Sequence, residues 1–261
     1  MYDVSNIFIN KFLIFLLVLV RMTSIFVISP VFSRKNMPTY LKIGLALFCT
    51  FIVAPGLGDI NVNYYNLIDF SILIFKEFLV GILLGFVSFL VFSSLLVAGQ
   101  IIDVQVGFGM VNIIDPINNV QVPLLGNFLY LLALNILLIT NGHHIFLSAL
   151  IKSYVVVPID ALVFSDVITN NLISIFVESF LIGFKIGIPI IAAVLLAEVS
   201  LGILARTVPQ MNVLIIGLPL RIIVGLLSLI FILPAFASTL EYIFDKLYAF
   251  MSVILQSMAK G

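Results

Sequence analysis

The stretch GQIIDVQVGFGMVNIIDP, from Gly99 to Pro116, lies between two long apolar runs and carries no Lys or Arg. It contains three glycines and two aspartates. Glycine permits backbone conformations that other residues avoid, so the chain can leave the helical conformation here. Inside a membrane protein, irregular backbone is tolerated only where it is buried in protein or faces a cavity. The segment is therefore a candidate pore or gate loop.

The composition of the whole chain indicates a protein embedded in the membrane. Of its 261 residues, 63% are hydrophobic and only 9% are charged, which is far from the composition of soluble domains. The formal net charge is zero, so charge gives no basis for nucleic-acid binding. The single cysteine, Cys49, excludes an intramolecular disulfide. We therefore expect one integral membrane domain that spans residues 1–261.

Six apolar runs have the length or composition of membrane helices, since a spanning helix needs about 20 residues. They are Phe12–Phe32, Leu41–Leu57, Ile68–Val97, Leu124–Thr140, Leu172–Leu196 and Val213–Ala237. A seventh helix over Ile145–Phe164 stays open, because Lys152, Pro158 and Asp160 interrupt it. A short amphipathic helix is expected after Ala237. The predicted fold class is an all-α, polytopic helical membrane protein.

Prolines and glycines inside the runs predict irregular, closely packed helices. Proline removes a backbone hydrogen bond and kinks or ends a helix, so we expect broken or strongly tilted hairpin helices. The prolines concerned are Pro30, Pro189, Pro219 and Pro234. Two glycine pairs at helical spacing favour close helix contact, although chance spacing explains them equally well. These pairs are Gly81 with Gly85, and Gly183 with Gly187.

Several charged residues lie inside or beside the apolar runs, where insertion of a central charge costs about 3 kcal/mol. Arg21 is the most enclosed by apolar sequence, and Glu77 and Asp103 are both candidate partners for it. The charges either pair and fix helix packing or line a water-filled path. For Arg206, pairing with Glu198 is favoured over anion binding. The expected buried charge network consists of Arg21, Glu77, Asp103, Glu198, Arg206 and Arg221.

Three blocks resemble the FliR/SctT family of type III export-gate proteins. They are the segment from Gly99 to Pro116, then VPLLGNFLYLLALNILLITNGHH from Val122, and ARTVPQMNVLIIGLPLRI from Ala205. The resemblance implies a subunit of a helical export gate with FliP-like and FliQ-like subunits, and a FlhB-like subunit on its cytoplasmic side. It also implies a place in the flagellar basal body, at the bacterial inner membrane, and export of unfolded flagellar proteins.

The same resemblance gives the glycine-flanked loop a role as a pore plug. Gly107 and Gly109 would let the loop move, while Phe108 and Met110 would fill a narrow pore with apolar groups. A tight connecting turn without a gating role is the alternative. Alternatives for the whole chain are an injectisome gate subunit, a small-solute or ion transporter, and an assembly scaffold. The sequence contains no catalytic motif and predicts neither an enzyme nor a cofactor.

Overall fold

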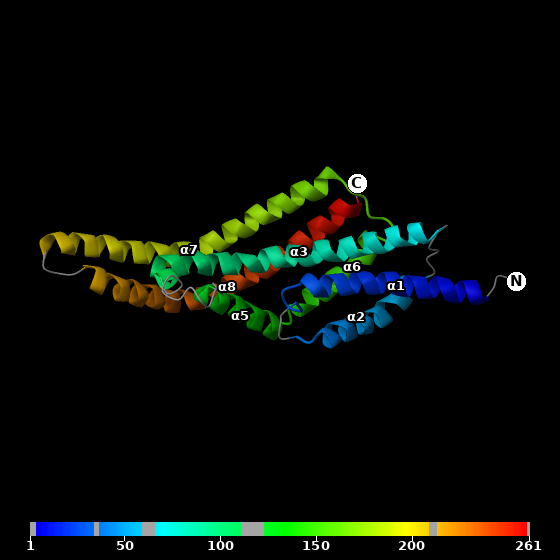
Figure 1. Cartoon of the computed structure of the whole chain (residues 1–261), viewed down its shortest axis with the longest axis horizontal. Helices are drawn as coiled ribbons and strands as arrows, with labels where there is room; N and C mark the ends of the chain where they lie inside the picture. The colour runs from blue at the N-terminus through cyan, green and yellow to red at the C-terminus, as the bar shows by residue number, and fades with distance from the viewer. Residues whose placement is uncertain (1–3, 34–36, 59–65, 111–122, 209–212, 260–261) are drawn as a thin grey trace. The chain divides into compact units, whose positions relative to one another are not determined.

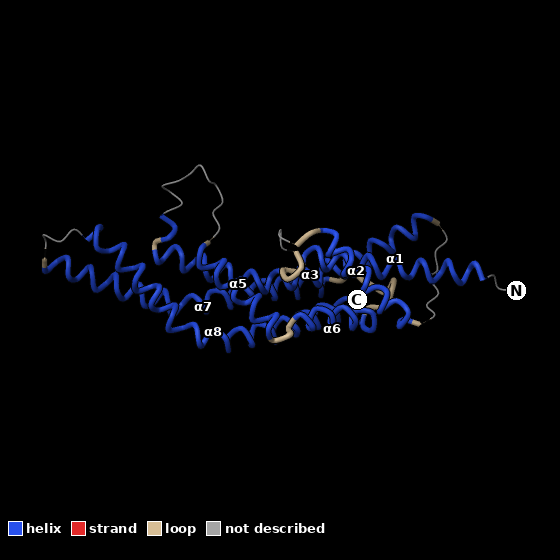
Figure 2. The backbone as a smooth tube through the Cα atoms, turned by 90° about the horizontal axis from the view of Figure 1, so that it is seen from below, coloured by secondary structure: helices blue, strands red, loops and turns tan. Residues whose placement is uncertain are grey.

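A computed structural model describes residues 4–33, 37–58, 66–110, 123–208 and 213–259. The chain is built from α-helices joined by short loops and two 3₁₀ turns, and no strand occurs in these ranges (Figures 1 and 2). The predicted all-α class is confirmed. The elements are α1 (Val4–Ile28), α2 (Thr39–Val53), η1 (Ala54–Leu57), α3 (Leu67–Val106), η2 (Phe108–Met110), α5 (Leu124–Ile139), α6 (His143–Val156), α7 (Asp166–Thr207) and α8 (Val213–Ala259).

Each of the six predicted apolar runs lies wholly or mostly in a helix, and the first part of the uncertain seventh run, up to Val156, belongs to α6. Within the described ranges, five helices are long and apolar enough to cross a membrane, or up to six if α5 and α6 together form one broken span. Proline marks several helix ends. Pro38 and Pro123 directly precede α2 and α5, and Pro158 follows the end of α6. Since proline lacks a backbone N–H, it costs least at such positions.

Three helices, α3, α7 and α8, are much longer than the sequence predicts, and α7 extends from Asp166 to Thr207 beyond both ends of its predicted run. α3 continues through Gly99 to Val106, so the first part of the candidate gate segment is helical rather than irregular. The reason is tertiary packing: a Cβ on Gly99 would overlap the backbone of Gly126, so this glycine serves a close helix contact. The expected separate amphipathic helix after Ala237 is instead the continuous end of α8.

The internal prolines do not end their helices. α7 continues through Pro189, and α8 continues through Pro219 and Pro234. Each proline removes one backbone hydrogen bond, and a buried apolar residue lies within two positions after Pro189 and Pro234. Ile190 is 1% exposed and Phe236 is 3% exposed. Pro30 does behave as predicted, because it lies just beyond the end of α1.

The helices form two compact units, each with its own core. The first unit contains Met1–Leu90, Asn141–Ile175 and Asp245–Gly261. In it, Phe15 of α1 meets Phe51 of α2 edge to face, with ring centroids 5.1 Å apart. A second edge-to-face contact joins Phe26 and Phe32 at 4.7 Å. Such aromatic pairs stabilise a core beyond the area that they bury.

The second unit contains Val91–Thr140 and Phe176–Phe244. Phe92 of α3 lies between aromatic residues from two other helices of this unit. Its ring contacts Tyr130 of α5 edge to face at 6.0 Å and stacks on Phe244 of α8 at 6.4 Å. The second unit is therefore organised around the C-terminal part of α3.

Glycines set the closest helix contacts in both units. In the first unit, a Cβ on Gly81 would lie 2.5 Å from the carbonyl oxygen of Arg21, and a Cβ on Gly85 would lie 3.0 Å from the Cβ of Ile28. In the second unit, a Cβ on Gly183 would overlap the carbonyl oxygen of Ser94. Small residues let helix backbones approach in this way, as the glycine spacing indicates.

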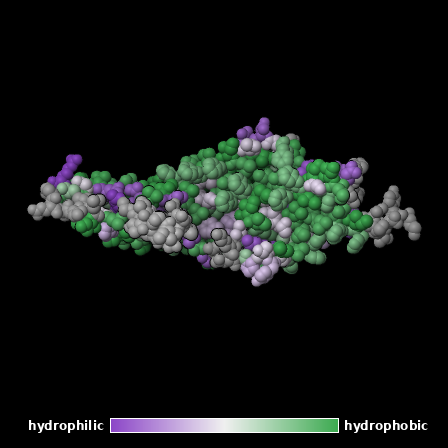
Figure 3. Space-filling view, viewed as in Figure 1, coloured by the Kyte–Doolittle hydropathy of each residue, from purple (hydrophilic) through white to green (hydrophobic). Residues whose placement is uncertain are grey.

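Much of the surface of the chain is apolar. Hydrophobic residues cover most of the face seen in Figure 3, and many large apolar side chains are exposed. α2 is an example: Phe48, Phe51 and Ile52 are each at least 60% exposed. Apolar surface on this scale marks contact with lipid or with other proteins.

The contact at Gly183 gives a testable prediction. Gly183→Ala should lower the melting temperature of the protein in detergent, because the new methyl group overlaps the backbone of Ser94. Gly202→Ala on the same helix is the matched control, since nothing lies within 4 Å of its Cβ position. Ala favours helix by up to about 1 kcal/mol over Gly, so the control should be neutral or stabilised. Equal melting temperatures of the two variants would contradict the α3–α7 contact.

Candidate functional site

Arg21 and Glu77 form a buried ion pair between α1 and α3. Nε of Arg21 donates to Oε2 of Glu77 at 2.6 Å, and Nη2 donates to Oε1 at 2.9 Å. Arg21 is 0% exposed and Glu77 is 1% exposed. Two parallel hydrogen bonds match the guanidinium fork to the planar carboxylate, which is among the strongest arrangements of such groups. Of the two acidic residues considered for Arg21, the structure places Glu77 beside it.

The remaining contacts of Arg21 come from α6 and from its C-terminal end. Nη1 donates to Oγ of Ser153 at 3.1 Å and to the carbonyl oxygen of Val157 at 3.0 Å. The guanidinium carbon lies 4.2 Å from the centre of the Tyr154 ring, in cation–π geometry. Tyr154 in turn donates its hydroxyl hydrogen to the carbonyl oxygen of Val18 at 3.3 Å. This cluster therefore joins α1, α3 and α6.

The contacts between Arg21 and α6 were not predicted from the sequence, although the end of α6 gave an indication of one of them. α6 ends at Val156, directly before Val157 and Pro158. The last carbonyls of a helix have no intrahelical donor, so a buried helix end needs an outside one. Arg21 supplies it to Val157. Ser153 and Tyr154 carry no comparable signal, because nothing in the sequence indicates which face of α6 meets α1.

A second ion pair lies beside the first. Nζ of Lys76 is 2.6 Å from Oδ1 of Asp160 and 3.2 Å from the carbonyl oxygen of the same residue. Asp160 has a φ of 72°, in the left-handed region, within the turn that follows α6. The side chains of Lys76 and Asp160 are 27% and 59% exposed, so this pair is worth much less than the buried one. It ties the same turn to α3.

Asp103 has a different partner from the one that sequence suggested. Its two carboxylate oxygens accept hydrogen bonds from the backbone N–H of Leu125, at 3.1 and 3.2 Å. Leu125 lies in the first turn of α5, whose N-cap is Pro123 and carries no side-chain cap. The first N–H groups of a helix need acceptors, and a negative charge there is favoured by the helix dipole. Asp103 therefore caps α5 from α3.

Glu198 and Arg221 form a partly exposed ion pair in the second unit. Nη2 of Arg221 is 2.5 Å from Oε1 of Glu198, with side chains 35% and 25% exposed. Nε2 of Gln105 donates to Oε2 of Glu198 at 3.4 Å, so the cluster joins α3, α7 and α8. Arg206 is exposed, and Glu198 is paired with Arg221 rather than with it. Among the described contacts, Glu77 is thus the partner of Arg21, the start of α5 that of Asp103, and Arg221 that of Glu198.

The glycine-flanked segment begins where α3 ends. The N–H of Gly107 donates to the carbonyl oxygen of Asp103 at 3.1 Å, and Gly107 has a φ of 100°. A glycine in this left-handed conformation directly after the last helical turn is a common helix end. Phe108 and Gly109 follow in η2 and are partly buried. The side chain of Met110 and residues 111–122 lie outside the described residues.

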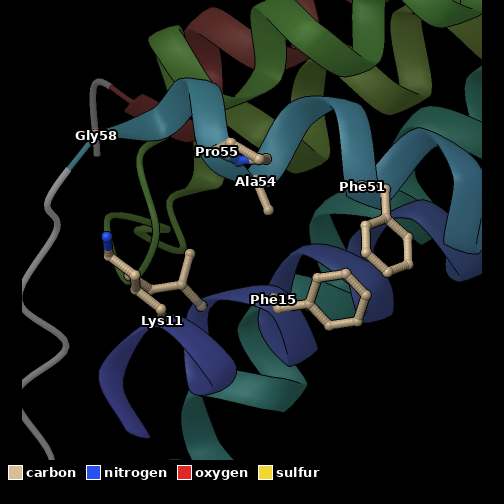
Figure 4. A pocket seen from close by; sticks show the side chains of 7 residues that line it. Lys11, Phe15, Phe51, Ala54, Pro55 and Gly58 are labelled. Atoms are coloured by element: carbon tan, nitrogen blue, oxygen red, sulfur yellow. The ribbon is translucent and has the colours of Figure 1, made fainter. Parts of the chain in front are cut away.

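An apolar cavity of about 370 Å³ lies between α1 and the end of α2 (Figure 4). Phe15 of α1 and Phe51 of α2 line one end of it, where their rings meet edge to face. Ala54 and Pro55 of η1 form the opposite side, with Lys11 at the edge. The cavity presents no cluster of reactive side chains, and no group of three or more potential metal ligands occurs in the described parts of the chain.

The chain resembles known proteins over most of its length. Residues 12–247 match the family described as bacterial export proteins, family 1. The chain is 37% identical over 233 residues to the flagellar biosynthetic protein FliR of Bacillus subtilis (strain 168), which covers 86% of this chain and 88% of that protein. It is 28% identical over 244 residues to the FliR protein of Escherichia coli (strain K12), with 92% of both chains covered. The corresponding protein of Aquifex aeolicus (strain VF5) is 27% identical over 249 residues, covering 95% of this chain and 96% of that protein.

The buried pair gives a second prediction. Arg21→Ala leaves the carboxylate of Glu77 buried without a cation, which should cost about 3–5 kcal/mol and markedly lower the melting temperature in detergent. Arg21→Lys should lose less stability, because the charge stays while the bidentate geometry is lost.

The control for this prediction removes both charges. Arg21→Met combined with Glu77→Met leaves no unpaired charge and should recover part of the stability lost in Arg21→Ala. Melting curves of the four proteins, measured in the same detergent, provide the comparison. A wild-type melting temperature for Arg21→Ala would show that the pair does not stabilise the first unit.

Proposed function

This chain belongs to the bacterial export proteins, family 1, and we propose that it helps form the channel through which unfolded flagellar proteins are exported. It is a membrane protein and a subunit of the flagellar export apparatus. The observation that carries the channel proposal is the Gly107–Met110 segment. The segment follows the long apolar helix α3, turns at Gly107, whose φ is positive, and continues into η2, in which Phe108 and Gly109 are partly buried.

The segment acts as the plug of the closed channel. Bulky apolar side chains such as Phe108 exclude water from a narrow passage, and a dry constriction does not conduct ions. Gly107 is the point at which the segment turns away from α3, because its conformation is accessible to few other residues. Phe108, Gly109 and Met110 then move aside when a substrate passes.

The chain works in an assembly and not alone. We propose that FliP-like and FliQ-like subunits surround it, that a FlhB-like subunit lies on the cytoplasmic side, and that the apparatus sits at the inner membrane. Two observations support this proposal. Large apolar side chains are exposed over much of the chain, and α7 and α8 carry the partly exposed ion pair of Glu198 and Arg221 among such side chains. The protein provides a passage and performs no catalysis, and its two compact units work as one module.

The function is tested by deletion of the gene. A strain without this chain should not swim and should not secrete hook and filament proteins, and a plasmid copy should restore both. Secretion is measured by immunoblot of the culture supernatant, with an unrelated secreted protein as the control. Normal secretion of hook and filament proteins by the deletion strain would overturn the proposed function.

The plug generates a third prediction. Deletion of Gly107–Val111 should leave the complex assembled but leaky, because water fills the passage when the apolar groups are removed. Phe108→Ala combined with Met110→Ala should give a smaller leak. The measurement is the membrane potential of cells that express each variant, together with complex assembly on native gels. A variant that lacks the segment, assembles and stays as tight as the wild type would identify the segment as a simple turn.

A fourth prediction concerns opening. Gly107→Val forces a branched side chain into a φ of 100° and places its Cβ 2.8 Å from Cδ1 of Leu218. This variant should stay tight but secrete less flagellin. Gly202→Val is the matched control outside the segment, because nothing lies within 4 Å of its Cβ position and its φ is not positive. Equal secretion by the two variants would remove the special role of Gly107.

A further inference from the structure

One face of α7 packs against α3, and the face opposite carries large exposed apolar residues. Gly183 contacts the backbone of Ser94, and Ile182 and Ile190 are buried on the same side. The residues on the outward face are strongly exposed: Leu181 47%, Phe184 44% and Ile188 45%. Their spacing of three and four residues makes them one continuous stripe on the helix.

Lys185 lies within this apolar stripe. It is exposed, and its neighbours on the helix surface are Leu181 and Ile188, four residues before and three residues after it. Within the described part of the chain, Lys185 makes no hydrogen bond and no ion pair. The stripe therefore combines an apolar surface with a single cation that has no internal counterpart.

Neither water nor lipid is a good environment for this stripe. In water, the apolar side chains around Lys185 would remain hydrated, which the hydrophobic effect opposes. In the hydrocarbon core, the ammonium group would cost about 3 kcal/mol. α7 has 42 residues and is therefore about 63 Å long. The hydrocarbon core of a membrane is about 30 Å thick, so about half of α7 lies outside that core.

A protein partner would remove both the cost of hydrated apolar side chains and the cost of an uncompensated ammonium group. An apolar helix that covers Leu181, Phe184 and Ile188 removes them from water. A carboxylate on that helix, placed opposite Lys185, compensates the ammonium charge. A buried cation needs such a partner, since burial without one is strongly unfavourable.

We propose that the outward face of α7 around Lys185 is the docking surface for a helix of a partner subunit, which presents one Asp or Glu to Lys185 among apolar side chains. This inference rests on the proposed function, because the partner is another subunit of the export apparatus. It adds the helix, the face and the chemistry of the contact.

The test uses substitutions that separate a protein partner from lipid. Lys185→Met keeps the apolar stem and removes the charge. Against a partner carboxylate, it strands that group and should lower the recovery of the assembled complex at least about tenfold. Lys185→Glu should lower recovery further, and Lys185→Arg should retain most of it. Against lipid, Lys185→Met should assemble as well as the wild type or better, which would overturn the proposal.

Two controls make the result specific. Asn170→Glu adds the same negative charge at an exposed position near the polar start of α7 and should leave assembly unchanged. The melting temperature of the isolated subunit should not change in Lys185→Met, because Lys185 has no described internal contact. A large drop in that melting temperature would assign Lys185 to internal stability and overturn the docking role.

The partner residue is identified by reversal of charge. Cells with Lys185→Glu are selected on motility agar for regained swimming, and the export-apparatus genes are sequenced. We expect suppressors that replace an Asp or Glu of a partner subunit by Lys, Arg or a neutral residue. Suppressors only within this chain would contradict the proposal. Failure of the proposed function is distinguishable, because it would appear as normal secretion in the deletion strain, whatever the Lys185 variants do.

Discussion

The ion pair between Arg21 and Glu77 is the contact on which the first unit depends. A buried guanidinium must have nearly all of its donors satisfied, so the helices around it have little freedom to shift. Glu77 fixes the position of α3 against α1, and the carbonyl of Val157 fixes the end of α6 against both. Gly81 allows this geometry, since a side chain there would collide with the backbone of Arg21 itself. Arg21 and Gly81 are 60 positions apart in the sequence. Together they define how α1 packs against α3.

The second unit is held together by contacts of a different kind. The ion pair of Glu198 and Arg221 is only partly buried, since the two residues keep about a quarter to a third of their side-chain surface exposed, whereas Asp103 is buried against the start of α5. The close contacts of the second unit come from Gly99, Gly183 and Gly225, each of which brings α3 near another helix. Such contacts depend on shape and little on charge, and they leave large apolar faces on α7 and α8 for neighbours. The first unit thus contains a fully buried ion pair, whereas the close contacts described in the second unit come mainly from glycines.

The sequence alone predicted where the helices lie but not how their polar residues pair. Apolar length is a local property, so each of the six runs lies mostly in a helix, and the uncertain seventh run is helical up to Val156 despite Lys152. Pairing is a tertiary property: Arg21 and Glu77 are 56 residues apart, and periodicity could not rank Glu77 above Asp103. Asp103 proved to cap α5, which required knowledge that α3 continues through Gly99. The family resemblance was carried by long idiosyncratic blocks, and the match over residues 12–247 confirms it.

The hydrogen bonds between Asp103 and Leu125 have a mechanical consequence for the chain between them. They join two residues 22 positions apart and hold the base of the intervening stretch together. The two ends of that stretch are therefore already close, and most of the entropy of closing a loop of this length has been lost in the folded state. The same carboxylate binds the first turn of α5, so it fixes the N-terminal end of α5 directly against the C-terminal end of α3. One side chain therefore sets the relative position of two helix ends that the chain itself joins only through the stretch between them.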